Sequence, residues 1–208
     1  NINPGSLNPG SGNSILAVNL KDEKSRELSL YANLNWNPTE RLSVSSGLRY
    51  THFALLGPFK QGQYDDSGSF LGVRDFSSSE TVVNYSKPEP RLGINYKVGE
   101  NSAIKASYAR IYQYIQNIYN TSTPLPTSRW KMSDTFIRPQ KNDTYGLGWY
   151  QNLTDLGLEI SSEGYYRKTE NNLTYKPGAN FFLSEFLEQE VTQAQGRTYG
   201  VEMSIRKN

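Results

Sequence analysis

Runs in which every second residue is apolar, joined by connections of two very different lengths, constrain the fold of this chain most. In residues 92–98 every even position is apolar, and residues 104–108 repeat the pattern after a polar turn at 99–102. A period of two residues predicts a β-strand with one apolar and one polar face. Such a strand can rest its apolar face on a protein core or on lipid, so this hairpin alone does not distinguish the two.

The same alternation returns along the chain and predicts about seven long strands. In addition to that hairpin, strands are expected at residues 27–37, 42–51, 143–150, 156–168 and 197–207. Further tight turns are expected at residues 37–40 and 151–155. Long connections, in which the period is lost, are predicted at residues 1–26, 54–83, 116–134 and about 169–196.

The regular alternation of tight turns and long connections favours a membrane barrel. Soluble sandwiches and barrels rarely alternate tight turns with long loops so regularly, whereas outer-membrane barrels have short periplasmic turns and long external loops. Strands of about ten residues can also cross the hydrocarbon when tilted. We therefore predict an all-β chain, a segment of an antiparallel transmembrane β-barrel, with lipid against the face of Leu92, Ile94 and Tyr96 and an aqueous lumen against the other face. Aromatic residues near strand ends are expected to form an interfacial girdle, among them Trp36, Tyr50, Trp149 and Tyr166.

Composition is compatible with this fold and excludes several functions. The 208 residues include 15 tyrosines and no cysteine, and the formal net charge is +2. The absence of cysteine excludes disulfides and thiolate metal sites, and the near-neutral charge without a basic stripe argues against nucleic acid as a partner. The mean hydropathy of −0.68 does not argue against membrane strands, because lumen-facing residues dilute their hydropathy.

Several phrases also resemble a known family. KPEPRLGINYKV, IKASYARIYQYIQ, LPTSRWKMSDTFIRPQ, LEISSEGYYRKTENNLTYKPGA and GRTYGVEMSIRK resemble, in order and spacing, the barrel of bacterial TonB-dependent outer-membrane receptors. The resemblance runs from about Glu27 to the end of the chain. It implies a barrel of about 22 strands with a plugged lumen. On this basis we expect residues 1–208 to be a partial barrel domain, with an external loop at 1–26, strands and loops at 27–208, and the plug domain outside these residues.

The resemblance implies a receptor and transporter in the bacterial outer membrane. It implies uptake of a scarce nutrient (an iron chelate, cobalamin, an oligosaccharide or a peptide) with energy coupled through TonB, and neither an enzyme activity nor a cofactor. Expected partners are outer-membrane lipid, the rest of the barrel with its plug, the TonB complex through the plug region, and a surface lipoprotein or other outer-membrane subunit. Two other classes stay open: a structural or passive barrel subunit of a larger outer-membrane complex, and a soluble carbohydrate-binding β domain.

The long loops are the expected ligand-contact surface, since a plugged barrel meets its ligand from outside. Aromatic and charged loop residues are the candidates: Tyr64, Phe70, Tyr119, Arg129, Trp130, Phe181 and Phe182. Trp130 beside Arg129 suggests stacking on a flat ligand. The single histidine, His52, lacks the partners that catalysis or zinc binding requires, and Asp65 and Asp66 match no defined calcium loop and are expected at a solvated loop tip.

Overall fold

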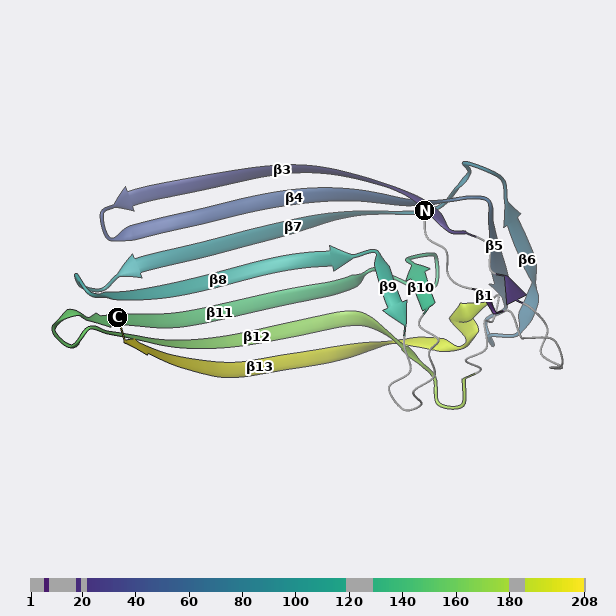
Figure 1. The fold of residues 1–208 in the computed structure, drawn as a ribbon. Helices are drawn as coiled ribbons and strands as arrows, with labels where there is room; N and C mark the ends of the chain where they lie inside the picture. Colours follow the sequence, from purple (N-terminus) through teal and green to yellow (C-terminus); the bar gives the residue numbers. More distant parts are fainter. Residues whose placement is uncertain (1–5, 8–17, 20–21, 119–128, 180–185, 208) are drawn as a thin grey trace.

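Seven long strands form one antiparallel sheet in the computed structural model, which describes residues 6–7, 18–19, 22–118, 129–179 and 186–207. The sheet order is β13-β12-β11-β8-β7-β4-β3, so strands adjacent in the sheet follow one another along the chain once the short hairpins are set aside (Figure 1). The long strands are β3 (Lys24–Thr39), β4 (Leu42–Leu56), β7 (Thr81–Lys97), β8 (Ser102–Gln113), β11 (Gln140–Leu153), β12 (Leu158–Tyr175) and β13 (Val191–Lys207). The strands and their alternation confirm the all-β prediction.

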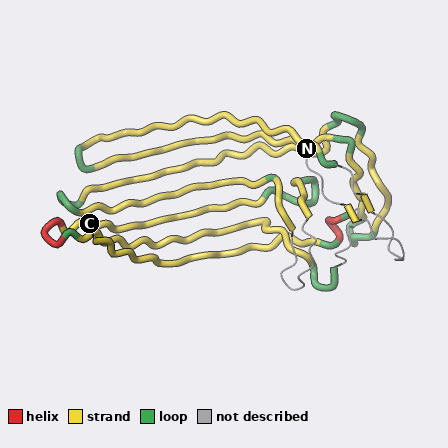
Figure 2. Tube along the Cα trace, in the orientation of Figure 1, coloured by secondary structure: helices red, strands yellow, loops and turns green. Residues whose placement is uncertain are grey.

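Short turns gather at one end of the sheet and long connections at the other, as Figure 2 shows. Between β3 and β4, the Thr39 hydroxyl oxygen accepts the backbone N–H groups of Arg41 and Leu42, which closes the turn. The turn after β11 contains the short 3-10 helix η1 (Thr154–Leu156) and ends at Gly157, whose φ of 61° is left-handed. A residue without a Cβ adopts that conformation at little cost. We call the two ends the turn side and the loop side.

The loop side contains more regular structure than the sequence predicts. The segment 54–83, predicted as a long loop, consists of the end of β4, the hairpin of β5 (Phe59–Tyr64) and β6 (Phe70–Phe76), and the start of β7. Most of β6 is exposed and its buried residue is Phe76 at the end of the strand, so the hairpin lacks the regular apolar period that reveals a strand. The segment 169–196 is likewise shorter as a loop, because β12 runs on to Tyr175 and β13 begins at Val191.

Smaller elements complete the loop side. The strands β9 (Ile115–Ile118) and β10 (Arg129–Met132) pair antiparallel, and β1 (Ser6–Leu7) pairs with β2 (Val18–Asn19). The 3-10 helix η2 (Leu187–Gln189) precedes β13. None of the described helical segments is long and apolar enough to cross a membrane.

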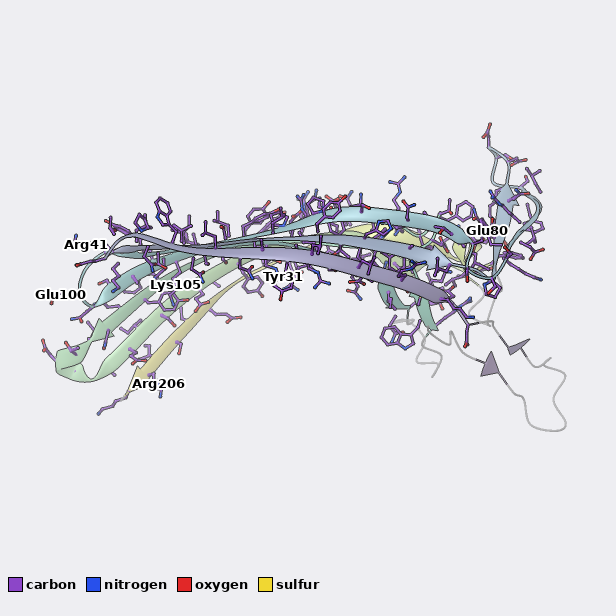
Figure 3. The ribbon with its side chains drawn as sticks, turned by 90° about the horizontal axis from the view of Figure 1, so that it is seen from above. Tyr31, Arg41, Glu80, Glu100, Lys105 and Arg206 are labelled. Carbon is purple, nitrogen blue, oxygen red and sulfur yellow. The ribbon has the colours of Figure 1, made fainter. Side chains whose placement is uncertain are left out.

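The buried core lies on the loop side and not between layers along the long strands. One cluster joins Phe53 and Leu55 of β4 to Tyr114 and Met132, and a second contains Ile118, Ile137, Leu173, Leu187 and Val191. Along the rest of the sheet, large apolar side chains stay uncovered, with Leu30 and Met203 exposing 80% and 81% of their surface. Figure 3 shows side chains standing on both surfaces of the long strands.

Candidate functional site

One face of the sheet is an apolar surface that crosses all seven strands. Residues directly opposite each other in an antiparallel pair have their side chains on the same face. Following the register from β3 to β13, one such row consists of Trp36, Val44, Ile94, Ala106, Leu147, Gly164 and Val201. We call this surface the apolar face.

The row next to it, toward the loop side, holds four tyrosines on four neighbouring strands. They are Tyr108, Tyr145, Tyr166 and Tyr199, on β8, β11, β12 and β13. The ring centroids of Tyr108 and Tyr145 lie 5.0 Å apart, and those of Tyr145 and Tyr166 lie 6.4 Å apart. A tyrosine ring is apolar while its hydroxyl is polar, so such a row suits a boundary between hydrocarbon and water. We call it the tyrosine row.

The apolar face runs obliquely to the strands. Toward the loops it ends at Leu28 on β3 and at Tyr199 on β13, and in each strand the next residue on that face is an arginine. The residue of β3 that shares a row with Tyr199 is Leu34, so the boundary shifts by 34 − 28 = 6 residues across the sheet. In a barrel with strands tilted by about 40°, six strand spacings of about 4.8 Å give an offset of roughly 24 Å, or about seven residues. The offset between the two edge strands is close to this value, although it arises between β3 and β8, since from β8 to β13 the boundary follows one register row.

The opposite face, which we call the polar face, carries hydroxyls, amides and charges. On it, the Lys105 ammonium lies 4.0 Å from the centre of the Tyr150 ring, and the Tyr150 hydroxyl donates to Glu163 at 2.7 Å. An open hollow of about 580 Å³ on the turn side of this face is bordered by residues that include Lys97, Lys105 and Arg206. A surface of this composition faces water or another polar protein surface, because an unpaired charge in hydrocarbon is costly.

Loop-side hairpins cover the polar face and leave the apolar face open. Phe53 and Tyr85 stand opposite each other on the polar face of β4 and β7 and pack in the cluster that contains Met132 of β10. The Tyr85 hydroxyl also donates to the Asp134 carbonyl oxygen at 2.6 Å. In barrels with a plugged or constricted lumen the covering loops fold over the interior, so the polar face is the lumen face.

Ion pairs between buried side chains connect the loop-side segments. The Lys131 ammonium lies 2.5 Å from Glu23 and 3.0 Å from Asp134, and it stacks over the Phe59 ring at 4.9 Å. Glu23 also accepts the Met132 backbone N–H at 2.8 Å. Burial opposes a charged ammonium, but the two carboxylates outweigh burial and raise the pKa of Lys131 above its ordinary value. The segment before β3 is thereby tied to β10, 108 residues further along the chain.

An aromatic cluster joins three loop-side segments. The Tyr64 ring lies 5.9 Å from Phe70 and 5.5 Å from Phe136, and Phe70 lies 5.3 Å from Phe186. The Tyr64 hydroxyl donates to Glu188 of η2 at 2.8 Å. Burial and this hydrogen bond raise the pKa of Tyr64 above its ordinary value. Phe70 and Phe136 remain exposed, so the cluster presents ring surface to the outside, and we call it the loop aromatic cluster.

The structure places the predicted ligand-contact residues in different surroundings. Tyr64 and Phe70 meet in the loop aromatic cluster, and Trp130 is exposed. Arg129 is buried, with 6% of its surface exposed, on the opposite face of β10 from Trp130, and burial lowers its pKa. The stacking of this pair on one flat ligand is therefore not prepared in this structure. The remaining candidates, Tyr119, Phe181 and Phe182, lie outside the described residues.

Sequence reasoning missed three members of the cluster. Phe136, Phe186 and Glu188 contact Tyr64 or Phe70, yet nothing local marks them, since their loops meet only through tertiary packing. Phe136 stands next to Ile137, which is buried, so the sequence does not show which of the two side chains faces outward.

His52 and Asp65, which the sequence analysis also considered, make hydrogen bonds within the protein. The His52 Nδ1 lies 2.8 Å from the Ser86 hydroxyl, on the apolar face just beyond Tyr50. The Asp65 carboxylate accepts the Ser67 and Ser69 backbone N–H groups in a tight loop tip; its pKa is lowered mainly by the hydrogen bond from the Ser67 hydroxyl. Within the part of the chain that the structure describes, no group of three or more His, Asp or Glu side chains is placed to hold a metal ion.

Comparison with known proteins gives one family and several structures. The model of a family described as TonB dependent receptor-like, beta-barrel matches residues 2–208. A comparison with curated proteins found no match.

Solved outer-membrane receptors share the fold at low identity. The chain is 18% identical to the alcaligin outer-membrane receptor FauA from Bordetella pertussis, with a TM-score of 0.51, over 88% of this chain and 27% of that chain. It is 13% identical to the copper transporter OprC, with a TM-score of 0.56, over 92% and 28%. It is 16% identical to a Serratia marcescens hemophore receptor HasR solved with its hemophore HasA and heme, with a TM-score of 0.55, over 87% and 31%. The chain thus spans less than a third of the length of each.

Proposed function

Because the chain belongs to the TonB-dependent receptor-like β-barrel family, we propose that it is part of the wall of a receptor that imports a scarce nutrient with TonB-coupled energy. Its family places it in the bacterial outer membrane, and members of this family are receptors and transporters, not enzymes. Uptake, the nutrient and the TonB partner belong to the whole receptor, of which this chain is a segment.

The two-faced sheet is the single observation that carries this proposal. An uncovered apolar surface across seven strands requires an apolar solvent, and a charged surface on the reverse side requires a polar one. Only a closed barrel in lipid supplies both and also pairs every backbone group. The same observation disfavours a soluble carbohydrate-binding domain, because its apolar face would be left in water.

Further strands are needed on both sides. In the described sheet β3 and β13 are the edge strands, and each has one neighbour. Unpaired strand edges are untenable in hydrocarbon, since each unsatisfied backbone group costs several kcal/mol. The rest of the barrel is thus the first partner of this chain, and the plug is expected against the polar face.

The solute is proposed to be met by the long loops. The loop aromatic cluster offers ring surface from Phe70 and Phe136, and Trp130 adds a third exposed ring. Aromatic rings with a few polar groups form a common kind of ligand pocket. Tyr119, in the connection from β8 to β11, and Phe181 and Phe182, in that from β12 to β13, stay candidates from the sequence and lie outside the described residues. The names of two structural neighbours, a copper transporter and a hemophore receptor solved with heme, support a metal or a metal complex as the solute.

Uptake by cells producing the full-length receptor tests the proposal. The measurement is accumulation of an isotopically labelled iron chelate, heme or copper, in cells with and without a working TonB complex. Uptake of one of these solutes that requires both receptor and TonB complex supports active import. Uptake that needs the receptor but not the TonB complex would instead support a passive barrel, and no uptake of any of them would support a structural subunit or another solute class.

A further inference from the structure

We propose that the apolar face carries, at its loop-side edge, a binding site for one phosphorylated lipid of the outer membrane. Four cations form its polar part, Arg110, Lys141, Lys168 and Arg197, which we call the basic rim. An apolar groove directly below the rim holds the acyl chains. The inference uses the membrane orientation of the sheet but not the identity of the transported solute.

The register places the basic rim immediately beyond the tyrosine row. Arg110, Asp143, Lys168 and Arg197 stand opposite one another in β8, β11, β12 and β13, each two residues toward the loops from a tyrosine of the row. Lys141 follows one step further, opposite Glu170. Two residues along a strand span about 7 Å, so on each strand the rim residue lies about 7 Å toward the loops from a tyrosine, on the side where lipid phosphates lie when the rings are at the hydrocarbon boundary.

The two carboxylates of this region leave cationic charge in excess. Asp143 is bound by Arg110 at 2.7 Å, by Lys141 at 3.1 Å and by the Tyr108 hydroxyl at 2.8 Å. Glu170 is bound by Lys141 at 3.3 Å and by Lys168 at 2.5 Å. Four cations against these two anions leave a net charge of 4 − 2 = +2.

The rim cations are more exposed than the carboxylate that they bind. The Asp143 side chain is only 7% exposed, whereas those of Arg110 and Lys168 are 31% and 39% exposed. Arg197 is exposed on β13 and makes no ion pair with a residue that the structure describes. The carboxylates therefore hold the rim together from within, and the outer donors remain directed at a ligand. Phosphate oxygens are the acceptors that Arg and Lys bind best.

A groove continues the site into the hydrocarbon. Gly164 stands between Leu147 and Val201 on the apolar face, below Tyr145, Tyr166 and Tyr199. These residues line an open groove of about 640 Å³. An added Cβ at Gly164 would meet no atom closer than 3.9 Å, so the glycine leaves space that a side chain could fill. The groove and the rim thus match the two halves of an amphiphile whose head group is anionic.

The charge of the apolar face is also unequal between its ends. On the loop side it carries Lys24, Arg26 and the four residues of the basic rim, whereas on the turn side of the described strands Lys207 is its one lysine or arginine. Each basic residue near a membrane surface strengthens binding of anionic lipid by about 1 kcal/mol, or about fivefold. The structure thus favours phosphorylated head groups in the leaflet on the loop side.

The test compares rim variants of the full-length receptor in nanodiscs of phosphatidylcholine containing a minor fraction of phosphatidic acid, with bound lipid counted by native mass spectrometry. Lys168→Gln with Arg197→Gln removes two rim cations without unpairing Asp143. Lys105→Gln with Arg206→Gln removes the same charges from the polar face and serves as the matched control. Gly164→Leu fills the groove and changes no charge.

We expect the rim variant to retain phosphatidic acid at least tenfold less than the unaltered receptor, the groove variant to lose it severalfold, and the polar-face control to match the unaltered receptor. Equal retention by all variants, or equal loss in the control, would overturn the proposal. Displacement of the lipid by millimolar inorganic phosphate would overturn it too, because the site would then hold free phosphate. Lipid binding is measured without solute uptake. The lipid proposal can therefore hold where the import proposal fails, and the import proposal can hold where the lipid proposal fails.

Discussion

The ring of Tyr108 lies 5.0 Å from that of Tyr145 on the neighbouring strand, at the loop-side limit of the apolar face. The Tyr108 ring belongs to the apolar surface, and its hydroxyl donates to Asp143 in the polar row beyond it. Aromatic pairs of this kind contribute about 0.5–1.5 kcal/mol beyond the area that they bury. The pair adds a side-chain contact to the register of β8 against β11.

Replacing Tyr145 tests this role. Tyr145→Ala removes both ring contacts, with Tyr108 and Tyr166, and is expected to lower the free energy of unfolding of the full-length receptor by about 1–3 kcal/mol. Tyr145→Phe keeps the ring and should cost less than half as much. The measurement is urea unfolding in phospholipid vesicles. Equal stability of the alanine variant and the unaltered receptor would show that the row is not a stabilising element.

The buried Lys131 is expected to control the loop side. Lys131→Met leaves Glu23 and Asp134 buried without their cation, and breaking such a pair from one side costs about 3–5 kcal/mol. Hydrogen exchange should then be faster in β9 and β10 but unchanged in the long strands. The double variant Glu23→Gln with Lys131→Met should recover part of the protection, because fewer charges remain unpaired; no recovery would mean that Lys131 acts through packing alone.

The same lysine gives a pH dependence. Because the pKa of Lys131 is raised in the folded receptor, its stabilising contribution is complete below the pKa of the unfolded chain, about 10.4, and is lost only as the pH rises through the higher folded value. Protection of β10 against protease should therefore stay constant from pH 7 to about pH 10 and fall at higher pH. A fall between pH 7 and pH 9 would contradict a raised pKa.

Much of the wall could be predicted from the sequence, because lipid and water act on alternate residues of every strand. That alternation is visible at Leu92, Ile94 and Tyr96 without any tertiary information. The elements on the loop side do not show this alternation. The hairpin of β5 and β6 protrudes into water and has no apolar period, and the ends of β12 and β13 carry mixed residues near the bulge between Thr169 and Asn172.

The candidate site was less predictable for a related reason. Arg129 lies in a predicted loop, yet it pairs with Ile118 in the β9–β10 hairpin and is buried. Phe186 lies in the predicted connection at about 169–196, yet it contacts Phe70, more than a hundred residues away along the chain. Contacts between loops depend on how the barrel brings their ends together, and no local pattern encodes that distance.

The loop aromatic cluster predicts a defect in solute capture. Phe136→Ala removes an exposed ring that contacts Tyr64, and loss of an aromatic anchor typically costs about 1–2 kcal/mol, or roughly 5- to 30-fold in Kd. Equilibrium binding of the solute identified by uptake provides the measurement. Leu156→Ala, an exposed apolar residue on the turn side, is the matched control. Equal binding by both variants would exclude Phe136 from the contact surface.

The orientation of the sheet is the central claim, and spin labels along β13 test it most directly. Single cysteines would be introduced in turn at residues 199 to 205, a stretch that contains no native cysteine, labelled with a nitroxide in the full-length receptor and placed in lipid bilayers. The labels at Tyr199, Val201, Met203 and Ile205 should collide mainly with oxygen, which dissolves in lipid, and those at Gly200, Glu202 and Ser204 mainly with a water-soluble nickel complex or be shielded by protein. The opposite phase, or no alternation along the strand, would contradict the account.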